Sequence, residues 1–161
     1  MTHDLLLRRK WTLRSHGRQV VFIKQKNESS AHVIMKALLW ALYLPTYPDL
    51  AVEVAIGDRF KPDVVQLDAA QSPVFWGEAG QVSERKIGSL VRRFPHTHFA
   101  LAKWATGLTP HAEIVQRVLA KRARSAPFEL IAFPRDSAER FFRPDGEIHI
   151  DRAHLTILSL S

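Results

Sequence analysis

Lys61-Pro62-Asp63-Val64-Val65 is followed, further along the chain, by Phe75-Trp76-Gly77-Glu78-Ala79-Gly80. Each block combines β-branched or aromatic residues with one carboxylate, which predicts a β-strand that bears one acidic residue. Glu78 follows Asp63 by fifteen residues, so the two strands can be joined by a loop and lie side by side. Both carboxylates could then face one divalent metal ion.

The segments around these blocks predict a mixed α/β order. Strands are expected over residues 50–56, 63–67 and 74–78, with turn residues between them. A helix precedes the three strands, because apolar residues recur at helical spacing over residues 33–42 before Pro45 ends the pattern. Three consecutive strands after one helix indicate a meander packed against that helix.

A second part of the pattern follows Ser83, which can begin a helix. Its apolar stripe has the spacing i, i+3, i+4, i+7, and consists of Ile87, Leu90, Val91 and Phe94. Residues 98–104 and 128–133 read as strands, and Thr109-Pro110 is a suitable start for a helix between them. The two strands, over residues 98–104 and 128–133, are expected to extend the sheet.

Both ends of the chain predict a peripheral β-hairpin. Residues 11–14 and 19–24 flank Gly17, and residues 140–143 and 147–150 flank a Pro-Asp-Gly turn. We therefore expect one domain over residues 1–161, because the sequence has no repeat or long linker. Its core spans residues 19–133, with an N-terminal hairpin region over residues 1–24 and a C-terminal hairpin region over residues 134–161.

The composition indicates a globular protein with an anionic partner. The net charge is +7, from 23 Lys and Arg against 16 Asp and Glu. Nucleic acid is the foremost partner for such a basic chain, although basic residues can also serve solubility alone. Residues expected to contact nucleic acid are Arg85, Lys86, Arg92, Arg93 and Lys103.

The composition also excludes several kinds of chemistry. Cys is absent, so the chain has no disulfide, thiolate zinc site or cysteine nucleophile. No P-loop or nucleophile elbow is present in the sequence. The apolar run Leu5-Leu6-Leu7 is too short for a signal peptide, and no longer run suits a membrane span. A cytoplasmic, soluble protein without a membrane partner is expected.

The motifs and their order resemble a known superfamily. The order helix, three strands, helix, strand resembles the PD-(D/E)XK nuclease-like superfamily, with Pro62-Asp63 and Glu78 at its acidic positions. The sequence Trp76-Gly77-Glu78-Ala79-Gly80-Gln81, followed by Glu84-Arg85-Lys86-Ile87, is similar to that of the YaeQ family, whose members have the same fold. The helix over residues 28–42 also resembles the first helix of YaeQ proteins. This resemblance covers most of residues 19–104 and implies a mixed sheet flanked by helices.

The resemblance implies metal-dependent phosphodiester hydrolysis, in which Mg²⁺ or Mn²⁺ stabilises charge and activates water. Asp63 and Glu78 are the expected metal ligands, and Glu28 or Glu53 could supply a third carboxylate. Glu28 could instead pair with the helix dipole, and Glu53 could be an outward strand residue. His96 and His98 have a spacing compatible with metal chelation, but no third ligand is evident and a strand-end pair is the simpler interpretation.

The motif departs from the superfamily at one position. Active members carry a lysine two residues after the second acid, where this chain has Gly80. Gln81 could orient the attacking water, and Lys86 could reach back from the next helix. Two hypotheses therefore stand: a Mg²⁺-dependent nuclease that uses Asp63, Glu78 and either Gln81 or Lys86, and a catalytically inactive module that binds nucleic acid or another partner.

Overall fold

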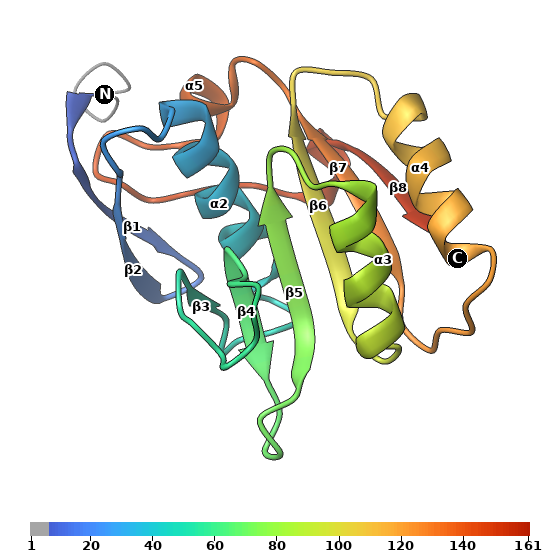
Figure 1. Ribbon diagram of the computed structural model, residues 1–161. Helices are drawn as coiled ribbons and strands as arrows, with labels where there is room; N and C mark the ends of the chain where they lie inside the picture. The colour runs from blue at the N-terminus through green and yellow to red at the C-terminus, as the bar shows by residue number, and fades with distance from the viewer. Residues whose placement is uncertain (1–6) are drawn as a thin grey trace.

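A six-stranded mixed sheet with the order β3-β4-β5-β6-β7-β8 runs through the computed structural model, which describes residues 7–161 (Figure 1). The parallel pairs are β5–β6 and β6–β7, and the other pairs are antiparallel. The strands are β3 (Ala51–Val52), β4 (Val64–Leu67), β5 (Pro73–Ala79), β6 (His98–Trp104), β7 (Phe128–Phe133) and β8 (Thr156–Leu160).

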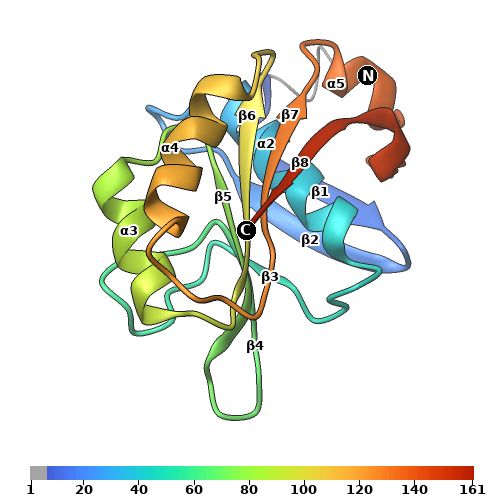
Figure 2. The same cartoon turned by 90° about the vertical axis from the view of Figure 1, so that its right-hand side faces the viewer.

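Helices cover both faces of this sheet and form, with it, a single α/β domain. Figure 2 shows α2 (Ser30–Tyr43) on one face, and α3 (Glu84–Arg93) and α4 (Thr109–Leu119) on the other. Each face has its own hydrophobic cluster, because successive residues of a strand point to opposite sides. Ala100 and Ala102 of β6 face α2, whereas Phe99 and Leu101 face α3 and α4. The expected order of helix, three strands, helix and strand is confirmed.

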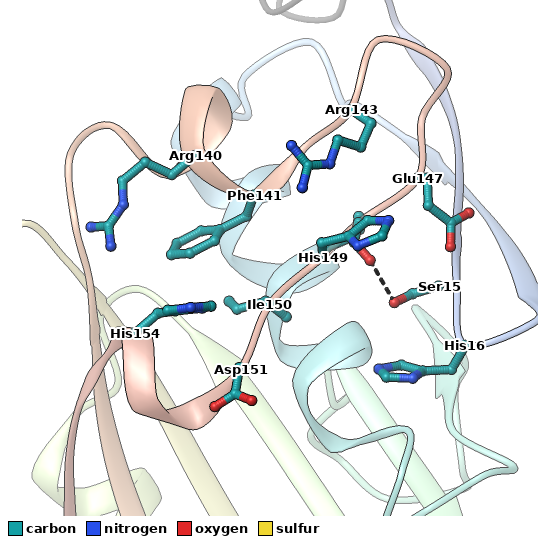
Figure 3. Close-up of a pocket in the computed structure, with 11 residues that line it drawn as sticks. Ser15, His16, Arg140, Phe141, Arg143, Glu147, His149, Ile150, Asp151 and His154 are labelled. Atoms are coloured by element: carbon teal, nitrogen blue, oxygen red, sulfur yellow. Dashed lines mark hydrogen bonds between the residues drawn. The ribbon is translucent and has the colours of Figure 1, made fainter.

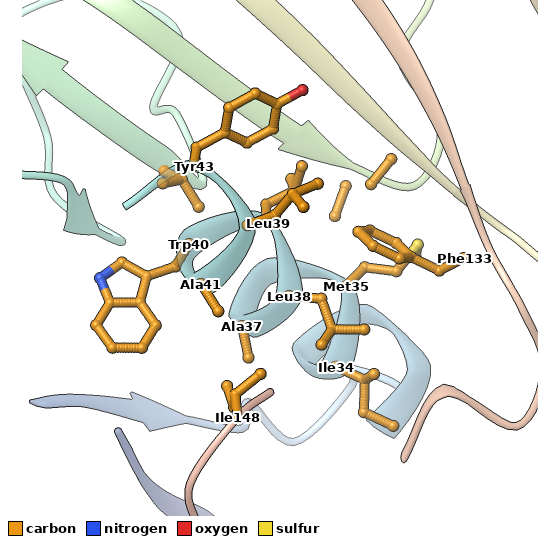
Figure 4. Close-up of a cluster of buried hydrophobic side chains, with 14 of the residues drawn as sticks. Ile34, Met35, Ala37, Leu38, Leu39, Trp40, Ala41, Tyr43, Phe133 and Ile148 are labelled. Atoms are coloured by element: carbon orange, nitrogen blue, oxygen red, sulfur yellow. The ribbon is translucent and has the colours of Figure 1, made fainter. Parts of the chain in front are cut away.

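Helix α2 is buried on every side because it lies between two layers. The side-chain oxygen of Ser29 accepts a hydrogen bond from the His32 amide at 3.1 Å and caps the helix. Residues 33–43 are all buried. Figure 4 shows Leu39, Tyr43 and Phe133 on the sheet side of the helix and Ile148 on the opposite side.

Shortening a side chain of this helix is expected to destabilise the protein. Leu38 is 0% exposed, and Leu38→Ala leaves a cavity that costs about 2 to 5 kcal/mol of unfolding free energy. Leu158→Ala is the matched control, because Leu158 is 36% exposed. Urea denaturation measures both; equal losses for the two variants would contradict this description of the core.

The N-terminal hairpin is confirmed and lies over α2. Strand β1 (Lys10–Ser15) pairs antiparallel with β2 (Arg18–Ile23). His16 and Gly17 connect them with φ angles of 49° and 75°, as a tight hairpin turn requires. Trp11, Leu13 and Phe22 pack inward and close the cluster around α2.

Three details of the predicted strands are wrong. Residues 50–56 form only β3, because Glu53 has a φ of 56° that breaks the extended conformation. The C-terminal hairpin is reduced to one bridge between Phe142 and Ile148, and the outer edge of its second arm bonds to β1, where the Ile148 amide donates to the Arg14 carbonyl. Helix α5 (Ser137–Phe141) occupies part of the expected first arm.

Strand β8 was not expected. It pairs antiparallel with β7 and forms one edge of the sheet. It follows a short 3₁₀ helix, η1 (Arg152–His154). Within residues 7–161, no helix combines the length and the apolar character needed to cross a bilayer.

Candidate active site at the carboxyl ends of β5 and β6

Asp63, the residue immediately before β4, lies opposite Glu78 of β5. Val64 is paired with Gly77, so the antiparallel register places Asp63 beside Glu78. The Asp63 amide donates to the Gly77 carbonyl at 3.1 Å, and Asp63 Oδ2 accepts from the Ala79 amide at 2.8 Å. The expected juxtaposition of the two acidic strands is therefore present in the structure.

Glu78 is a buried carboxylate, only 6% exposed. Its Oε1 accepts hydrogen bonds from Trp76 Nε1 at 2.9 Å and from Lys86 Nζ at 3.0 Å. Burial and, after it, the negative charge of Asp63 raise the pKa of Glu78 above its usual value, despite these two donors. The two carboxylates thus repel each other, and a cation between them would relieve that repulsion.

His32 on α2 contacts Asp63 from the other side. Its Nε2 lies 3.8 Å from Asp63 Oδ2 and 3.1 Å from the Ala79 carbonyl oxygen, and its Nδ1 lies 2.6 Å from Glu28 Oε2. Hydrogen bonding to Asp63 is the main cause that raises the pKa of His32. Sequence reasoning missed this histidine, which lies in the first turn of α2, just after Glu28 and the Ser29 cap.

Glu28 and Glu53, the two candidates for a third metal-binding carboxylate, both contact Lys36 instead. Lys36 Nζ lies 2.6 Å from Glu28 Oε2 and 2.9 Å from Glu53 Oε1, and Lys36 is only 4% exposed. Each carboxylate therefore faces a buried ammonium group. In residues 7–161, no three His, Cys, Asp or Glu side chains gather as a ready-made metal cluster.

Lysine 103 enters the site from β6, the strand parallel to β5. Its Nζ donates to the Gly80 carbonyl at 2.7 Å, and the residue is only 8% exposed. The alternation along β6 places Lys103 on the face of Phe99 and Leu101, and Trp76 and therefore Glu78 lie on this same face. Burial lowers the pKa of Lys103.

The backbone conformation at Gly80 disfavours a lysine at this position. Gly80 has a φ of 91°, a conformation that residues with a Cβ rarely adopt, so a lysine at this position would be strained. The Gly80 amide donates to the Ala102 carbonyl at 3.0 Å, which brings Lys103 level with Gly80. The Lys103 ammonium group therefore lies beside the Gly80 carbonyl, on the strand next to β5.

Of the two sequence candidates for the lysine's role, Lys86 contacts Glu78, whereas Gln81 does not face the site. Lys86, in the first turn of α3, is paired with Glu78, and its Nζ lies 5.0 Å from the centre of the Phe60 ring. Gln81 is exposed in the loop between β5 and α3. His111, near the start of α4, is a further neighbour: burial and the charge of Lys103 lower its pKa.

The expected nucleic-acid contacts separate into two groups. Arg85 and Arg92 line a groove of about 310 Å³ together with Arg59 and Arg122, and no carboxylate lines it. The others are bound to protein groups: Arg93 pairs with Asp58, Lys86 with Glu78, and Lys103 with the Gly80 carbonyl. His96 contacts Ser125 and His98 contacts Glu129, so the two histidines do not form a common site.

The donor set of this site suits Mg²⁺ or Mn²⁺. Both ions prefer oxygen ligands, and Mg²⁺ commonly takes one or two carboxylates while it keeps waters and binds a substrate phosphate. The second oxygens, Asp63 Oδ1 and Glu78 Oε2, make no hydrogen bond to residues 7–161. The arrangement lies at the carboxyl ends of two parallel strands, before the helices α3 and α4, where α/β proteins commonly bind ligands.

Comparison with solved structures identifies the same fold in two bacterial proteins. The YaeQ protein from Pseudomonas syringae matches with a TM-score of 0.60 and 16% identity, over 88% of this chain and 80% of that one. The YaeQ protein from Xanthomonas axonopodis pv. citri matches with a TM-score of 0.57 and 14% identity, over 89% and 82%. No protein-family model and no curated protein matches the sequence. At these identities the likeness establishes a shared fold.

Proposed function

We propose that this chain, which has the fold of the YaeQ proteins, belongs to that family within the PD-(D/E)XK superfamily and hydrolyses phosphodiester bonds with Mg²⁺ or Mn²⁺. Two observations support the proposal: the strand register places Asp63 beside Glu78, and the buried Lys103 donates to the carbonyl of Gly80, two residues after Glu78. This combination matches the chemical needs of phosphodiester cleavage.

Each residue has a separate role in the proposed reaction. Asp63 and Glu78 would hold the metal ion, which, when bound, stabilises negative charge on the phosphate and activates water. Lys103 Nζ, oriented by the Gly80 carbonyl, would position the attacking water, and burial lowers the pKa of this lysine. His32 fixes Asp63 in place through its contacts with Asp63 and Glu28.

The proposed substrate is DNA or RNA. The chain carries a net charge of +7, and four arginines without a carboxylate among them line the groove on α3. That helix also bears Lys86, which contacts Glu78, so the groove adjoins the candidate site. A phosphate backbone bound along the arginines would lead to the carboxylates. A basic chain without Cys suits the reducing cytoplasm, where nucleic acids are present.

A cleavage assay tests the proposal. The protein is incubated with supercoiled plasmid, single-stranded DNA and RNA in the presence of Mg²⁺ or Mn²⁺, beside Asp63→Ala prepared in parallel. We expect the wild type to cut at least one substrate in a metal-dependent way and Asp63→Ala to be inactive. Equal cleavage by both proteins would show that a contaminating nuclease is responsible and would refute the proposed nuclease activity of this protein.

The arginine groove makes an independent prediction about binding. Removal of one phosphate contact lowers the slope of log affinity against log salt by about 0.7 for single strands and about 0.9 for duplex DNA. Arg85→Gln with Arg92→Gln should therefore flatten the slope by roughly twice that amount. Arg18→Gln with Arg135→Gln is the matched control, since both are exposed and lie outside the groove. Fluorescence anisotropy at several salt concentrations measures both; identical slopes would place the nucleic acid elsewhere.

A second function, a non-catalytic nucleic-acid or partner-binding module, has one observation in its favour. Glu78 is already paired with Lys86 at 3.0 Å, and only two carboxylates meet at the site. A metal-free site of this kind would keep salt-dependent binding while lacking cleavage of every substrate. Binding that is unchanged by Mg²⁺, Mn²⁺ and Asp63→Ala would favour this module over the nuclease.

A further inference from the structure

A cavity of about 580 Å³ lies between the end of β1 and the C-terminal segment (Figure 3). None of its lining residues belongs to the candidate active site. The cavity is of the size that commonly holds a small molecule. Its walls come from residues 15–16, from the end of α5 and from residues 147–154.

The walls of this cavity are held together by the backbone. The Arg14 amide donates to the Gly146 carbonyl at 3.0 Å, and the Ile148 amide donates to the Arg14 carbonyl at 2.7 Å. The hydroxyl group of Ser15 donates to the Ile148 carbonyl at 2.9 Å. The cavity is therefore formed before any ligand arrives, which lowers the entropic cost of binding.

Its two carboxylates already have partners. Glu147 Oε2 lies 3.6 Å from Arg14 Nε, and Asp151 Oδ1 accepts a hydrogen bond from the Ala153 amide at 2.7 Å. Both negative charges are thus partly compensated by protein groups. Among the other charged side chains of the cavity, Arg140 pairs with Asp136 at 3.8 Å.

Four nitrogen-bearing side chains in the cavity are unpaired. The guanidinium group of Arg143 and the imidazoles of His16, His149 and His154 form no hydrogen bond or ion pair with residues 7–161. Figure 3 shows His154 and His16 on opposite sides of the cavity, with Ile150 between them and with Arg143 and His149 above. Donor groups from three parts of the chain therefore surround one space with an apolar residue at its centre.

We infer that this cavity binds a small organic phosphate monoester. A phosphate dianion accepts the parallel hydrogen bonds of a guanidinium group and the single bonds of imidazole N–H groups. Ile150 offers an apolar contact for the organic part of the molecule. A metal ion fits this cavity less well, because within residues 7–161 no three His or acidic side chains are close enough to share one. The inference does not depend on the proposed nuclease function.

Phenyl phosphate is a suitable probe, with benzyl alcohol as its uncharged counterpart. Histidine side-chain NMR follows the titration without added metal. We expect the ring signals of His16, His149 and His154 to move together and saturate with phenyl phosphate, and to stay in place with benzyl alcohol. No saturable movement, or movement confined to His32 beside Asp63, would overturn the proposed site.

Two exposed arginines provide the matched variants. Arg143→Gln is expected to weaken the affinity for phenyl phosphate by at least about tenfold, because it removes a charged hydrogen-bond donor. Arg135→Gln is expected to bind as the wild type does, since Arg135 is exposed and lies outside the cavity. Equal affinities for all three proteins, or equal losses in both variants, would refute Arg143 as a phosphate ligand. Asp63→Asn separates this site from the proposed active site, because it should abolish cleavage and leave phenyl phosphate binding intact.

Discussion

Lys103→Met is expected to lower metal-dependent phosphodiester cleavage by about 100-fold or more, because in the proposed reaction it removes the group that positions the attacking water. Methionine keeps most of the length and the apolar stem of the lysine, so the packing of β6 against α3 and α4 should persist. The initial rate of plasmid nicking measures the effect. The variant should still bind Mn²⁺ as tightly as the wild type, since Lys103 is not among the proposed metal ligands.

Lys86→Met is the matched control for this experiment. Lys86 contacts Glu78 at 3.0 Å, and its side chain is 24% exposed, so it differs from the buried Lys103 in both position and surroundings. We expect Lys86→Met to retain cleavage within about tenfold of the wild type, because in the proposed reaction Lys103, and not Lys86, positions the attacking water. Loss of activity in Lys86→Met with full activity in Lys103→Met would assign the lysine's role to α3.

Glu129→Gln is expected to lower the unfolding free energy by about 3 kcal/mol, as the removal of one partner from a buried ion pair does. Glu129 is 5% exposed and lies at the centre of a polar network within β7. Its Oε1 accepts from Tyr43 Oη at 2.8 Å and lies 2.7 Å from His98 Nε2, and its Oε2 contacts Arg152 of η1. The glutamine would leave these groups without their carboxylate.

Chemical denaturation at several pH values measures this effect. Burial alone would raise the pKa of Glu129, but hydrogen bonds from His98, Arg152 and Tyr43 outweigh burial and lower the pKa to about 2. A lowered pKa means that the stabilisation is complete above the ordinary value of 4.5 and is lost as the pH falls towards 2. The difference between wild type and Glu129→Gln should therefore shrink over that range. A difference that stays constant with pH would contradict the ionised network.

The sequence was sufficient to predict the paired carboxylates. Asp63 and Glu78 each stand in a strand of recognisable pattern, and two consecutive strands joined by a short loop usually pair. The antiparallel register then brings the two residues together. The order of the central elements followed from the hydrophobic periodicity of α3 and from the continuous apolar runs of α2 and β6.

Lys103 could not be assigned to the site in this way. Its position depends on the parallel register between β5 and β6, and a crossover helix separates these strands in the sequence. His32 and Arg152 likewise meet their partners only through tertiary packing. One local signal was available for Glu129, because a single acid in the apolar segment Phe128–Phe133 indicates a buried carboxylate that needs partners.

The predicted C-terminal hairpin differs from the structure for a related reason. A Pro-Asp-Gly turn indicates that the chain reverses direction, but it does not decide which strand receives the hydrogen bonds afterwards. Ile148 pairs with Arg14 of β1, and Thr156–Leu160 pairs with β7. Both partners lie far away in the sequence. The same long-range pairing creates the cavity between β1 and the C-terminal segment.

The most direct test of the central claim is the number of Mn²⁺ ions that the protein binds, measured by electron paramagnetic resonance. The proposed site predicts that the wild type binds Mn²⁺, that Asp63→Asn and Glu78→Gln each lose this binding, and that Lys103→Met keeps it. Glu53→Gln serves as the control, because Glu53 is held by Lys36. Mn²⁺ binding that survives both Asp63→Asn and Glu78→Gln, or no binding by the wild type, would contradict the assignment of these two carboxylates as the metal site.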